Sequence, residues 1–399
     1  MKKLKIVTLL GIRPDIIRMF KLIEMLDKGQ EKNGYEHIFG HTGQHFDYEL
    51  DKVFYEQLGV RQPDFNLRVG QTLKERGGKT SHAYQAALLY EKVAEMIETY
   101  KPDVVMYLGD TNSVLSSVVV SRYGIPVVHI EAGGRSYDWR MPEEKNRIVI
   151  DHLSDALYCY MPRHKEILVK EGVEDFRLKV VGNIIYDALE RFLPIADTNT
   201  VLEDLHLKKD SYALVTLHRE ENTSEQSSLS AKLADLIKIA EEIPVIWPLM
   251  PRVKGNLEKF GLYDSLIHSK ITITKPLGYL EFLKLQKEAK VIITDSGTVQ
   301  EEAAILGVPA VIARRSTERP ETIIAKASIL DENDLYNNVK KAMVLDKKWD
   351  RNLLNTVGGS PSEIIYSDLV EKIASGYFEK SRSFDQLKCE KLVREAYGK

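Results

Sequence analysis

Charged side chains follow several short apolar runs of this chain, at the points where predicted β-strands end. Asp110 and Glu131 each follow such a run, His218 follows another, and Arg13 follows the first run of the chain. Each alone also fits a structural role, as a helix cap, a solvated loop carboxylate or a core-edge imidazole. Because parallel strands deliver their carboxyl ends to one edge of a sheet, we expect these residues to share one site. Carboxylates and an imidazole together can move protons to and from a substrate.

The segment from Val291 to Glu321 has the pattern of an anion-binding turn. Four apolar or β-branched residues predict a buried strand, and the sequence Asp295-Ser296-Gly297 then leads into a helix expected to begin near Thr298. A helix N-terminus exposes unpaired N–H groups and the positive end of the helix dipole, which suits a phosphate. An ordinary strand–turn–helix unit has the same local pattern, so the rest of the chain must decide between the two.

Further carboxylates accompany both regions. Glu301 and Glu302 lie about one turn into the predicted helix, where a carboxylate can accept hydrogen bonds from ribose hydroxyls. Glu143 and Glu144 follow Pro142, where they fit either favourable charge at a helix N-terminus or acid–base chemistry by Glu143. Because neighbouring carboxylates raise one another's pKa, one of such a group can stay protonated near neutrality and act as an acid.

Short apolar strands alternate with amphipathic helices, which predicts an α/β fold with parallel sheets. The predicted strands are Lys5–Leu10, His37–His41, Val104–Leu108, Val127–Ile130, Ala156–Cys159, Arg177–Val181, Tyr212–Leu217, Val245–Pro248, Ile271–Ile273, Val291–Thr294 and Ala310–Ala313. We expect two doubly wound, Rossmann-like domains that face a central cleft. The predicted limits are 1–190 for the N-terminal domain, 191–365 for the C-terminal domain, and 366–399 for a helical tail that packs on the first domain.

Composition excludes several classes of partner. The 399 residues suggest two domains, and a net charge of −3 gives no support for nucleic-acid binding. Cys159 and Cys389 form neither a metal motif nor a disulfide framework, which is typical of a reducing cytoplasm. The apolar run at the N-terminus stops at Arg13, too early for a signal peptide, and no stretch approaches the roughly 20 apolar residues of a membrane span.

Eight motifs resemble, in order, those of the non-hydrolysing UDP-N-acetylglucosamine 2-epimerase family. They are GIRPD (11–15), HTGQH (41–45), GDT (109–111), EAG…MPEEKNR (131–147), GN…DAL (182–189), HREEN (218–222), DSGTVQEEA (295–303) and TERPE (317–321). The resemblance spans nearly the whole chain up to about Glu321. It implies a two-domain fold of the glycosyltransferase-B type, a UDP-sugar substrate, no metal or other cofactor, and a homodimer.

The resemblance also implies a reaction. The C2 proton of the sugar is removed and UDP leaves C1 in an anti elimination, which gives a 2-acetamidoglucal. UDP then adds back after C2 is protonated on the other face, and the product serves surface polysaccharide synthesis. Asp110, Glu131 and Glu143 resemble the family's acid–base carboxylates, and His218 resembles its essential histidine beside the diphosphate.

A second set of residues matches substrate-binding positions of the family. They are Arg13, Arg18, Arg147, Phe282, Ser296, Gly297, Thr298, Glu302 and Arg319. The resemblance places Arg13, Ser296 and Gly297 at the diphosphate. It places Glu302 at the ribose and Phe282 near the uracil ring, although an apolar helix position explains Phe282 as well.

The chain departs from the family pattern at several positions. Arg18 stands where lysine is usual, which keeps the charge but not the hydrogen-bond geometry, and Asp15 replaces the usual glutamate. Gln44 and His45 match positions that bind a second, activating UDP-sugar in some bacterial members. Met250 stands where histidine is common, which argues against such activation.

Alternative substrates and reactions stay open. The loop between residues 131 and 143 resembles branches that act on UDP-diacetamido uronic acids or UDP-6-deoxy sugars. A glycosyltransferase on the same fold does not need three carboxylates around C2. A hydrolysing 2-epimerase usually carries a different pattern after the histidine of HREEN.

Overall fold

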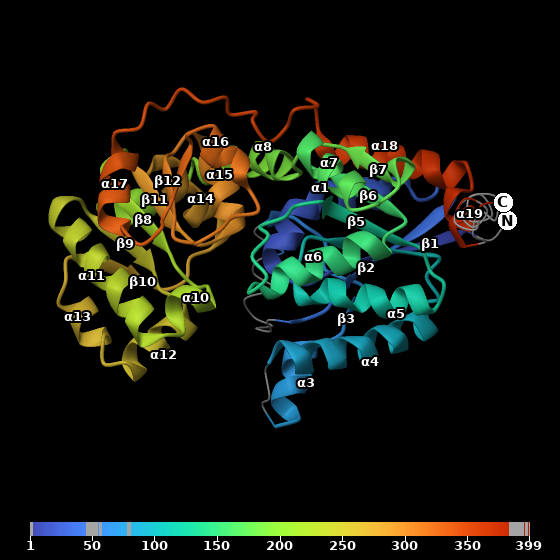
Figure 1. The fold of residues 1–399 in the computed structure, drawn as a ribbon, viewed down its shortest axis with the longest axis horizontal. Helices are drawn as coiled ribbons and strands as arrows, with labels where there is room; N and C mark the ends of the chain where they lie inside the picture. Colours follow the sequence, from blue (N-terminus) through green and yellow to red (C-terminus); the bar gives the residue numbers. More distant parts are fainter. Residues whose placement is uncertain are drawn as a thin grey trace. The chain divides into compact units, whose positions relative to one another are not determined.

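The computed structural model describes residues 3–44, 55, 58–77, 81–382, 395 and 398, so that His45 and Cys389 lie outside the described residues. The chain divides into two compact α/β units (Figure 1). The first comprises Met1–Gly134, Asp138–Ala188 and Val357–Lys399, and the second comprises Arg135–Tyr137 and Leu189–Thr356. The second unit is therefore almost continuous in sequence, whereas the first is completed by residues that follow the second.

The first unit contains a sheet of seven parallel strands in the order β3-β2-β1-β4-β5-β6-β7. The strands are β1 (Leu4–Leu10), β2 (Tyr35–His41), β3 (Phe65–Asn66), β4 (Val104–Leu108), β5 (Val127–Ala132), β6 (Ala156–Cys159) and β7 (Leu178–Val180). The strand order reverses between β1 and β4, which is the signature of a doubly wound fold. The near-continuous apolar strands are explained by helices on both faces of the sheet.

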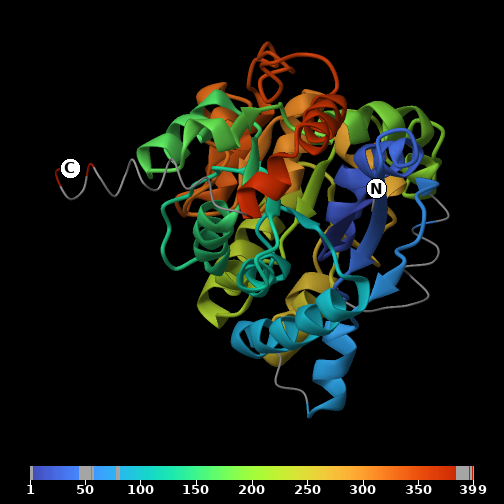
Figure 2. The same cartoon turned by 90° about the vertical axis from the view of Figure 1, so that its right-hand side faces the viewer.

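The helices of the first unit lie on both faces of that sheet (Figure 1). They are α1 (Arg13–Gly29), α3 (Val69–Glu75), α4 (His82–Tyr100), η1 (Asn112–Ser116), α5 (Ser117–Arg122), α6 (Pro142–Leu153), α7 (Pro162–Lys170), η2 (Asp175–Arg177), α18 (Pro361–Ala374) and α19 (Tyr377–Arg382), with α8 (Ile185–Ala196) at the border of the units. On one face, Val93 of α4, Val120 of α5 and Ile150 of α6 pack with Val105 and Val127 of the sheet. Figure 2 shows α3 packed beside α4, in light blue.

The returning segment is tied to the first unit by polar contacts as well as by the packing of α18 on α1. The Tyr158 hydroxyl donates to Asp368 of α18 at 2.9 Å, and Lys179 donates to the same carboxylate at 2.8 Å. At the start of α18, Asp187 accepts from the backbone N–H of Ser362 at 2.8 Å. These contacts are buried or half-buried, so the segment is an integral part of the first unit.

The second unit contains six parallel strands in the order β10-β9-β8-β11-β12-β13, with the reversal between β8 and β11. The strands are β8 (Ala213–Thr216), β9 (Val245–Pro248), β10 (Ile271–Thr274), β11 (Val291–Thr294), β12 (Ala310–Ile312) and β13 (Ser328–Leu330). The helices are α9 (Val201–Asp204), α10 (Glu220–Thr223), α11 (Gln226–Glu242), α12 (Pro251–Lys259), α13 (Tyr263–Ile267), α14 (Tyr279–Glu288), α15 (Gly297–Leu306), α16 (Pro320–Ile324) and α17 (Leu335–Met343). Both units therefore share one winding, and the expected α/β class is confirmed.

Successive residues of the strands contribute to two apolar layers in the second unit, one on each face of the sheet. Ile293 packs with Leu233 of α11 and Val339 of α17 on one face. Its neighbour Ile292 packs with Ala303 of α15 on the other face, as expected because successive strand residues point to opposite sides. Figure 1 shows the same arrangement, with the sheet between α11 and α17 on one side and α14 and α15 on the other.

All the predicted strands are present, but two short edge strands were not predicted. β3 has only two residues, and β13 begins with Ser328, so neither forms an apolar run that stands out in the sequence. β12 is shorter than the apolar run from Val308 suggests, because Pro309 has no N–H to donate to a neighbouring strand. The helix expected from Thr298 begins one residue earlier. Across the described ranges, we find no helix with the length and apolar character needed to cross a membrane.

Candidate functional site

The first unit places its predicted site residues at the point where the strand order reverses. β1 and β4 lie side by side, and the chain leaves them toward opposite edges of the sheet. Such reversals leave a crevice beyond the strand ends, where ligands of doubly wound folds bind. Arg13 is the first residue of α1 and is half-buried. Asp110 follows β4 after a single glycine, and Glu131 lies near the end of β5, so both carboxylates are at this edge.

Arg18 connects two carboxylates of the first unit. It is 5 % exposed, and its Nη2 donates to Asp15 Oδ1 at 2.9 Å, while Nη1 forms an ion pair with Glu131 Oε2. Asp15 and Arg18 meet because residues three apart on a helix share a face. Asp15 also accepts from the backbone N–H groups of Gly11 and Ile12, both at 3.3 Å. Glu131 is thus held, through Arg18, by the N-terminal turn of α1.

Asp15 has a raised pKa, although the sequence does not single it out as a site residue. Its complete burial raises the pKa to about 6, because loss of hydration penalises the carboxylate more than the Arg18 charge favours it, and the charge of Glu131 raises it further. The sequence predicts one protonated carboxyl among neighbouring carboxylates of the site. The pKa of Asp15, at the N-terminus of α1, is raised but lies below neutrality, so this carboxyl is mostly ionised at pH 7.

Arg147 of α6 holds the second carboxylate. It is 3 % exposed, and its Nη1 forms an ion pair with Asp110 Oδ2, while Nη2 donates to Glu144 Oε2 at 2.6 Å. Asn146, one residue earlier, donates from Nδ2 to the backbone oxygen of Asp110 at 2.9 Å. Glu144 is buried in this contact, whereas Glu143 is half-buried in the first turn of α6. Of the two glutamates, Glu144 is therefore a partner of Arg147, and Glu143 remains the acid–base candidate.

The backbone around Glu131 is strained. Glu131 has φ +74°, in the left-handed region that non-glycine residues rarely adopt, and the β5–β6 register shifts between Ile130 and Ala132. Gly109, with φ +71°, approaches closely from the neighbouring strand. A Cβ atom there would lie 3.3 Å from Glu131 Oε2 and 3.4 Å from Arg18 Nη2. Because of this irregular backbone, the Glu131 side chain points toward Arg18 and does not follow the regular up-and-down alternation of strand residues.

In the second unit, Asp295 organises the turn that carries His218. Asp295 follows β11 and is fully buried, and its Oδ2 accepts from the backbone N–H groups of His218 and Arg219 and from Asn222 Nδ2, each at 2.9 Å. His218 Nδ1 lies 3.3 Å from Asp295 Oδ1, and the imidazole is 47 % exposed. The imidazole is therefore oriented and still accessible. The asparagine of HREEN is a signal in the sequence from which this network could have been predicted.

Ser296 caps α15 in the anion-binding turn. Its Oγ accepts from the N–H of Val299 at 3.5 Å, and its own N–H donates to Thr294 Oγ1 at 3.0 Å. Thr298 lies half-buried in the first turn of the helix. The remaining N–H groups of that turn have no place in the intrahelical pattern, which leaves the turn suited to an anion.

Gly297 lies directly beneath Arg319. A Cβ atom at position 297 would lie 2.5 Å from Arg319 Nη1 and 2.9 Å from Glu318 Oε1, so only glycine leaves room for both side chains. Arg319 Nε donates to Glu301 Oε1 at 2.6 Å, and Nη1 forms an ion pair with Glu318. Of the two glutamates in the QEE sequence, Glu301 therefore orients Arg319 beside the helix N-terminus.

Glu302 is buried in a polar cluster between α14 and α15. Its two carboxylate oxygens accept from the Tyr279 hydroxyl at 3.0 Å and from Gln286 Nε2 at 2.7 Å. Burial, together with the charge of Glu302, holds the pKa of Tyr279 well above its usual value, so the hydroxyl keeps its proton. Phe282 lies between Tyr279 and Gln286 on α14, where it packs partly buried against the apolar layer that contains Leu285.

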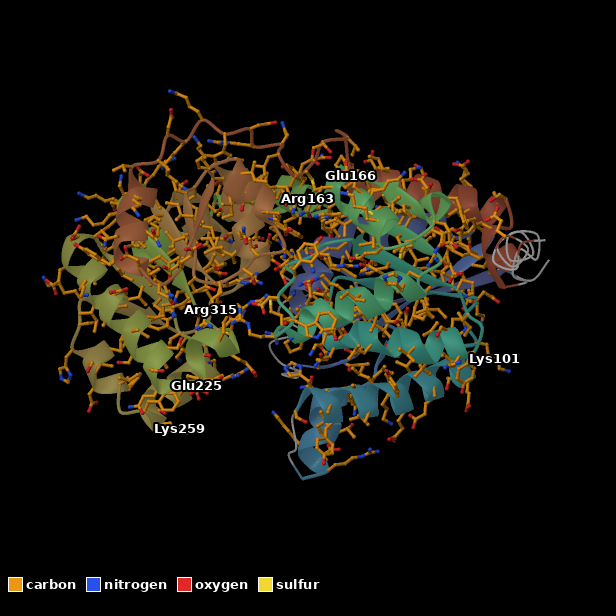
Figure 3. All side chains as sticks on the ribbon, in the orientation of Figure 1. Lys101, Arg163, Glu166, Glu225, Lys259 and Arg315 are labelled. Carbon is orange, nitrogen blue, oxygen red and sulfur yellow. The ribbon has the colours of Figure 1, made fainter. Side chains whose placement is uncertain are left out.

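Burial distinguishes these arginines from the other charged residues. Figure 3 shows Lys101 after α4, Glu166 on α7 and Lys259 on α12, all of which are exposed, as charged residues usually are. Arg18 and Arg147 are buried with carboxylate partners, an arrangement that costs desolvation and so points to a function beyond stability. In the part of the chain that is described, no group of three or more histidine, cysteine, aspartate or glutamate residues is placed to hold a metal ion.

The fold and these two sites define the class of the protein. Two doubly wound α/β units, one with carboxylates paired to arginines and one with an anion-binding helix terminus, form an enzyme of the glycosyltransferase-B fold type. The family model described as UDP-N-acetylglucosamine 2-epimerase matches residues 27–357. The chain belongs to this UDP-N-acetylglucosamine 2-epimerase family.

Individual relatives agree with this assignment. The UDP-N-acetylglucosamine 2-epimerase of Methanococcus maripaludis is 39 % identical over 356 residues, which cover 87 % of this chain and 93 % of the relative. The UDP-2,3-diacetamido-2,3-dideoxy-D-glucuronate 2-epimerase of Pseudomonas aeruginosa is 35 % identical over 331 residues, 82 % of this chain and 88 % of the relative. The crystal structure of the Methanocaldococcus jannaschii UDP-GlcNAc 2-epimerase in complex with UDP-GlcNAc and UDP has a TM-score of 0.83 and 37 % identity, with 92 % of this chain and 100 % of that chain covered.

Proposed function

We propose that this enzyme inverts C2 of a UDP-N-acetylhexosamine, with UDP-N-acetylglucosamine and UDP-N-acetylmannosamine as its two substrates. A base removes the C2 proton, the C1–O bond to UDP breaks, and a 2-acetamidoglucal forms. An acid then protonates C2 on the opposite face, and UDP bonds again to C1. The observation that carries the proposal is the arrangement of Asp110 and Glu131, each fixed by its own buried arginine at one strand edge.

The first unit supplies the acid–base groups in this proposal. The C2–H bond is weakly acidic, so its removal needs a carboxylate held in one orientation. The Arg147 and Arg18 ion pairs provide that orientation for Asp110 and Glu131. Glu143, half-buried at the start of α6, is the third acid–base group. Arg13, at the N-terminus of α1, contributes positive charge toward the leaving diphosphate.

The second unit binds the UDP group in this proposal. The diphosphate bonds to the N–H groups at the N-terminus of α15 and to Ser296, with Arg319 and His218 as additional donors. Glu302 accepts from the ribose hydroxyls, since each carboxylate oxygen can accept a second hydrogen bond beyond those of its protein partners. Phe282 packs beside the uracil ring. Hydrogen bonds that fix Arg319, Glu302 and the turn of His218 support this assignment.

Deuterium incorporation tests the reaction. The enzyme is incubated with UDP-N-acetylglucosamine in deuterated water, and the products are followed by proton NMR. We expect loss of the C2 proton signal of the sugar and the appearance of the UDP-linked manno isomer. Free N-acetylmannosamine with free UDP would instead identify a hydrolysing enzyme, and absence of exchange with every UDP-hexosamine would refute the proposal.

Amide variants test the two carboxylates separately. Asp110→Asn and Glu131→Gln should each lower turnover by a factor on the order of 10² or more, because each removes a proton-transfer group. If one residue is the base for the gluco isomer and the other for the manno isomer, C2 exchange will be lost from opposite substrates in the two variants. Full turnover in either variant would remove that residue from the mechanism.

A modified sugar is the second candidate substrate. The Pseudomonas aeruginosa relative, 35 % identical to this chain, is named for a diacetamido glucuronate linked to UDP. The exchange assay is therefore run in parallel with UDP-N-acetylglucosamine, UDP-2,3-diacetamido-2,3-dideoxyglucuronate and a UDP-6-deoxyhexosamine. The substrate is the compound with the highest kcat/KM. We further propose that the product serves surface polysaccharide synthesis and that the enzyme is a homodimer, which sedimentation equilibrium tests.

A further inference from the structure

A buried histidine and aspartate lie directly behind the two proposed acid–base carboxylates. His129 belongs to β5 and Asp151 to α6, and both side chains are completely buried. Their Nδ1 and Oδ1 atoms are 2.7 Å apart. A histidine within an apolar strand is a signal that the sequence offers, since VVHIEA interrupts a run of core residues. The substrate-binding assignments above do not use either residue.

Two further hydrogen bonds of the pair reach the backbone near the proposed acid–base residues. His129 Nε2 lies 2.8 Å from the backbone oxygen of Gly109, which directly precedes Asp110. Asp151 Oδ2 accepts from the N–H of Gly133, two residues after Glu131, at 3.2 Å. One buried pair therefore connects the turn after β4 to the turn after β5.

The backbones of both turns are irregular. Gly109, Glu131 and Gly133 have φ values of +71°, +74° and +83°. A Cβ atom at Gly133 would lie 2.4 Å from the backbone oxygen of His164, so this glycine is also tightly enclosed. Glycine adopts a positive φ without cost, so the strained residue is Glu131, and such a residue persists only where the surrounding structure fixes it. The bonds from His129 and Asp151 are direct restraints on both turns.

The hydrogen-bond partners of His129 indicate where the protons of its ring lie. A backbone carbonyl only accepts hydrogen bonds, so Nε2 carries a proton. Nδ1 faces a carboxylate at 2.7 Å, and two lone pairs cannot approach so closely, so a second proton lies between Nδ1 and Asp151. One proton closes the bond to Gly109, and the other closes the bond to Asp151.

We propose that His129 and Asp151 form an imidazolium–carboxylate pair whose function is to position Asp110 and Glu131 for proton transfer. They are positioning residues, since they contact the turns and not the reacting atoms. The positioning role rests on the proposed function, but the number of protons on the His129 ring can be measured without any turnover.

The chain contains a matched pair that serves as a control. His37 Nδ1 lies 2.6 Å from Asp27 Oδ1, and its Nε2 lies 2.9 Å from Thr8 Oγ1. A hydroxyl can donate as well as accept, so this imidazole satisfies both contacts with a single proton. The His37 side chain is as buried as that of His129, but its bonds lead to β1 and α1 rather than to the acid–base turns.

The key variant is Asp151→Asn. The asparagine oxygen can still accept from Gly133, and its NH2 group can donate to Nδ1 of a neutral imidazole, whose single proton then lies on Nε2. The ion pair between the two turns is thereby replaced by weaker neutral hydrogen bonds. In serine protease triads the same substitution leaves the geometry intact but lowers kcat strongly. We expect kcat to fall about 10- to 100-fold while KM changes less than about threefold, since proton transfer and not UDP binding is disturbed.

The control variant is Asp27→Asn, which should leave kcat within twofold of the wild type while lowering the melting temperature. Asp151→Glu restores a carboxylate and should recover part of kcat, which a purely structural role would not predict. If Asp151→Asn does not fold, His129→Gln replaces it, because an amide can still donate to the Gly109 oxygen. Wild-type kcat in a folded Asp151→Asn protein would overturn the proposal.

Nitrogen-15 NMR of histidine-labelled enzyme measures the protons directly. The His129 signals are assigned by their absence in His129→Gln. We expect two protonated ring nitrogens at His129 in the wild type and one in Asp151→Asn. A single protonated nitrogen in the wild type would overturn the ion pair, even if the enzyme epimerises as proposed. Two protonated nitrogens in an enzyme that fails the deuterium assay would refute the proposed function alone, and positioning would then be measured with whichever substrate the panel identifies.

Discussion

The raised pKa of Asp15 predicts a pH-dependent difference in stability between the wild type and Asp15→Asn. Asp15 is fully buried, and burial raises its pKa from 3.8 to about 6. An acid with a raised pKa binds its proton more tightly in the folded state, so the folded state gains stability as the pH falls from 6 toward 3.8. That stability is complete below pH 3.8 and is lost as the pH rises through 6. Asparagine cannot titrate, so the variant lacks this dependence.

The magnitude follows from the two pKa values. A shift of about two units corresponds to about 3 kcal/mol once the pH is below both values. At pH 5 the wild type should have gained about 1.4 kcal/mol relative to its stability at pH 8. For a unit of this size, a change of that magnitude shifts the melting temperature by about 3–6 °C. We therefore expect the difference in melting temperature between wild type and Asp15→Asn to change by that amount between pH 8 and pH 5.

Scanning calorimetry of both proteins at pH 5, 6, 7 and 8 measures the change, and all other titrations cancel in the difference. Asp331→Asn provides the control, since Asp331 is also buried but its pKa is lowered. Burial opposes that shift, and the hydrogen bond and charge of Lys232 outweigh it. The stability that Asp331 contributes is lost only below about pH 4. The difference in melting temperature between the wild type and Asp331→Asn should therefore not change from pH 5 to 8. A flat profile for Asp15→Asn would show that Arg18 keeps Asp15 ionised, and would refute the reasoning.

Three further substitutions test the site. Gly297→Ala puts a methyl group against Arg319 and should raise KM for the UDP-sugar up to about tenfold, or about 1.4 kcal/mol, with little change in kcat; an unchanged KM in steady-state assays would contradict the close packing. In Arg147→Lys, the ammonium group cannot bond Asp110 and Glu144 together as the planar guanidinium does, so kcat should fall about tenfold or more. Turnover equal to that of the wild type would show that the positive charge alone is sufficient. Asp295→Asn turns an amide toward backbone donors, so the histidine turn should loosen, with a lower melting temperature and at least about a tenfold loss of kcat; wild-type values of both would rule out its organising role.

The sequence allows the strand ends to be predicted because the strands are buried on both faces and read as continuous apolar runs. Residues directly after such runs, among them Asp110, His218 and Ser296, therefore fall at the functional edges of their sheets. The same logic fails for residues inside elements. His129 lies within a strand and Asp15 within a helix turn. The importance of His129 depends on Gly109 beside the neighbouring strand, and that of Asp15 depends on its burial next to Arg18.

The pairing of charges could not be predicted from the sequence. Arg18 meets Glu131 and Arg147 meets Asp110 over separations that only the fold brings together. The left-handed backbone of Glu131 also leaves no signal, since glutamate has no preference for that conformation. By contrast, Gly297 was predicted as part of the anion-binding turn, although its contact with Arg319 required the structure.

The division of the first unit along the chain has a consequence for biosynthesis. The second unit is nearly continuous, so it can acquire its core as soon as it leaves the ribosome, whereas α18 reaches α1 and Asp368 reaches Tyr158 only after the whole second unit has been made. At usual rates of translation this delay is on the order of ten seconds or more. The first unit must wait during that time with one face of α1 uncovered. Chaperone demand should therefore concentrate on the earliest part of the nascent chain, and a circular permutant that begins at residue 357 should reduce it.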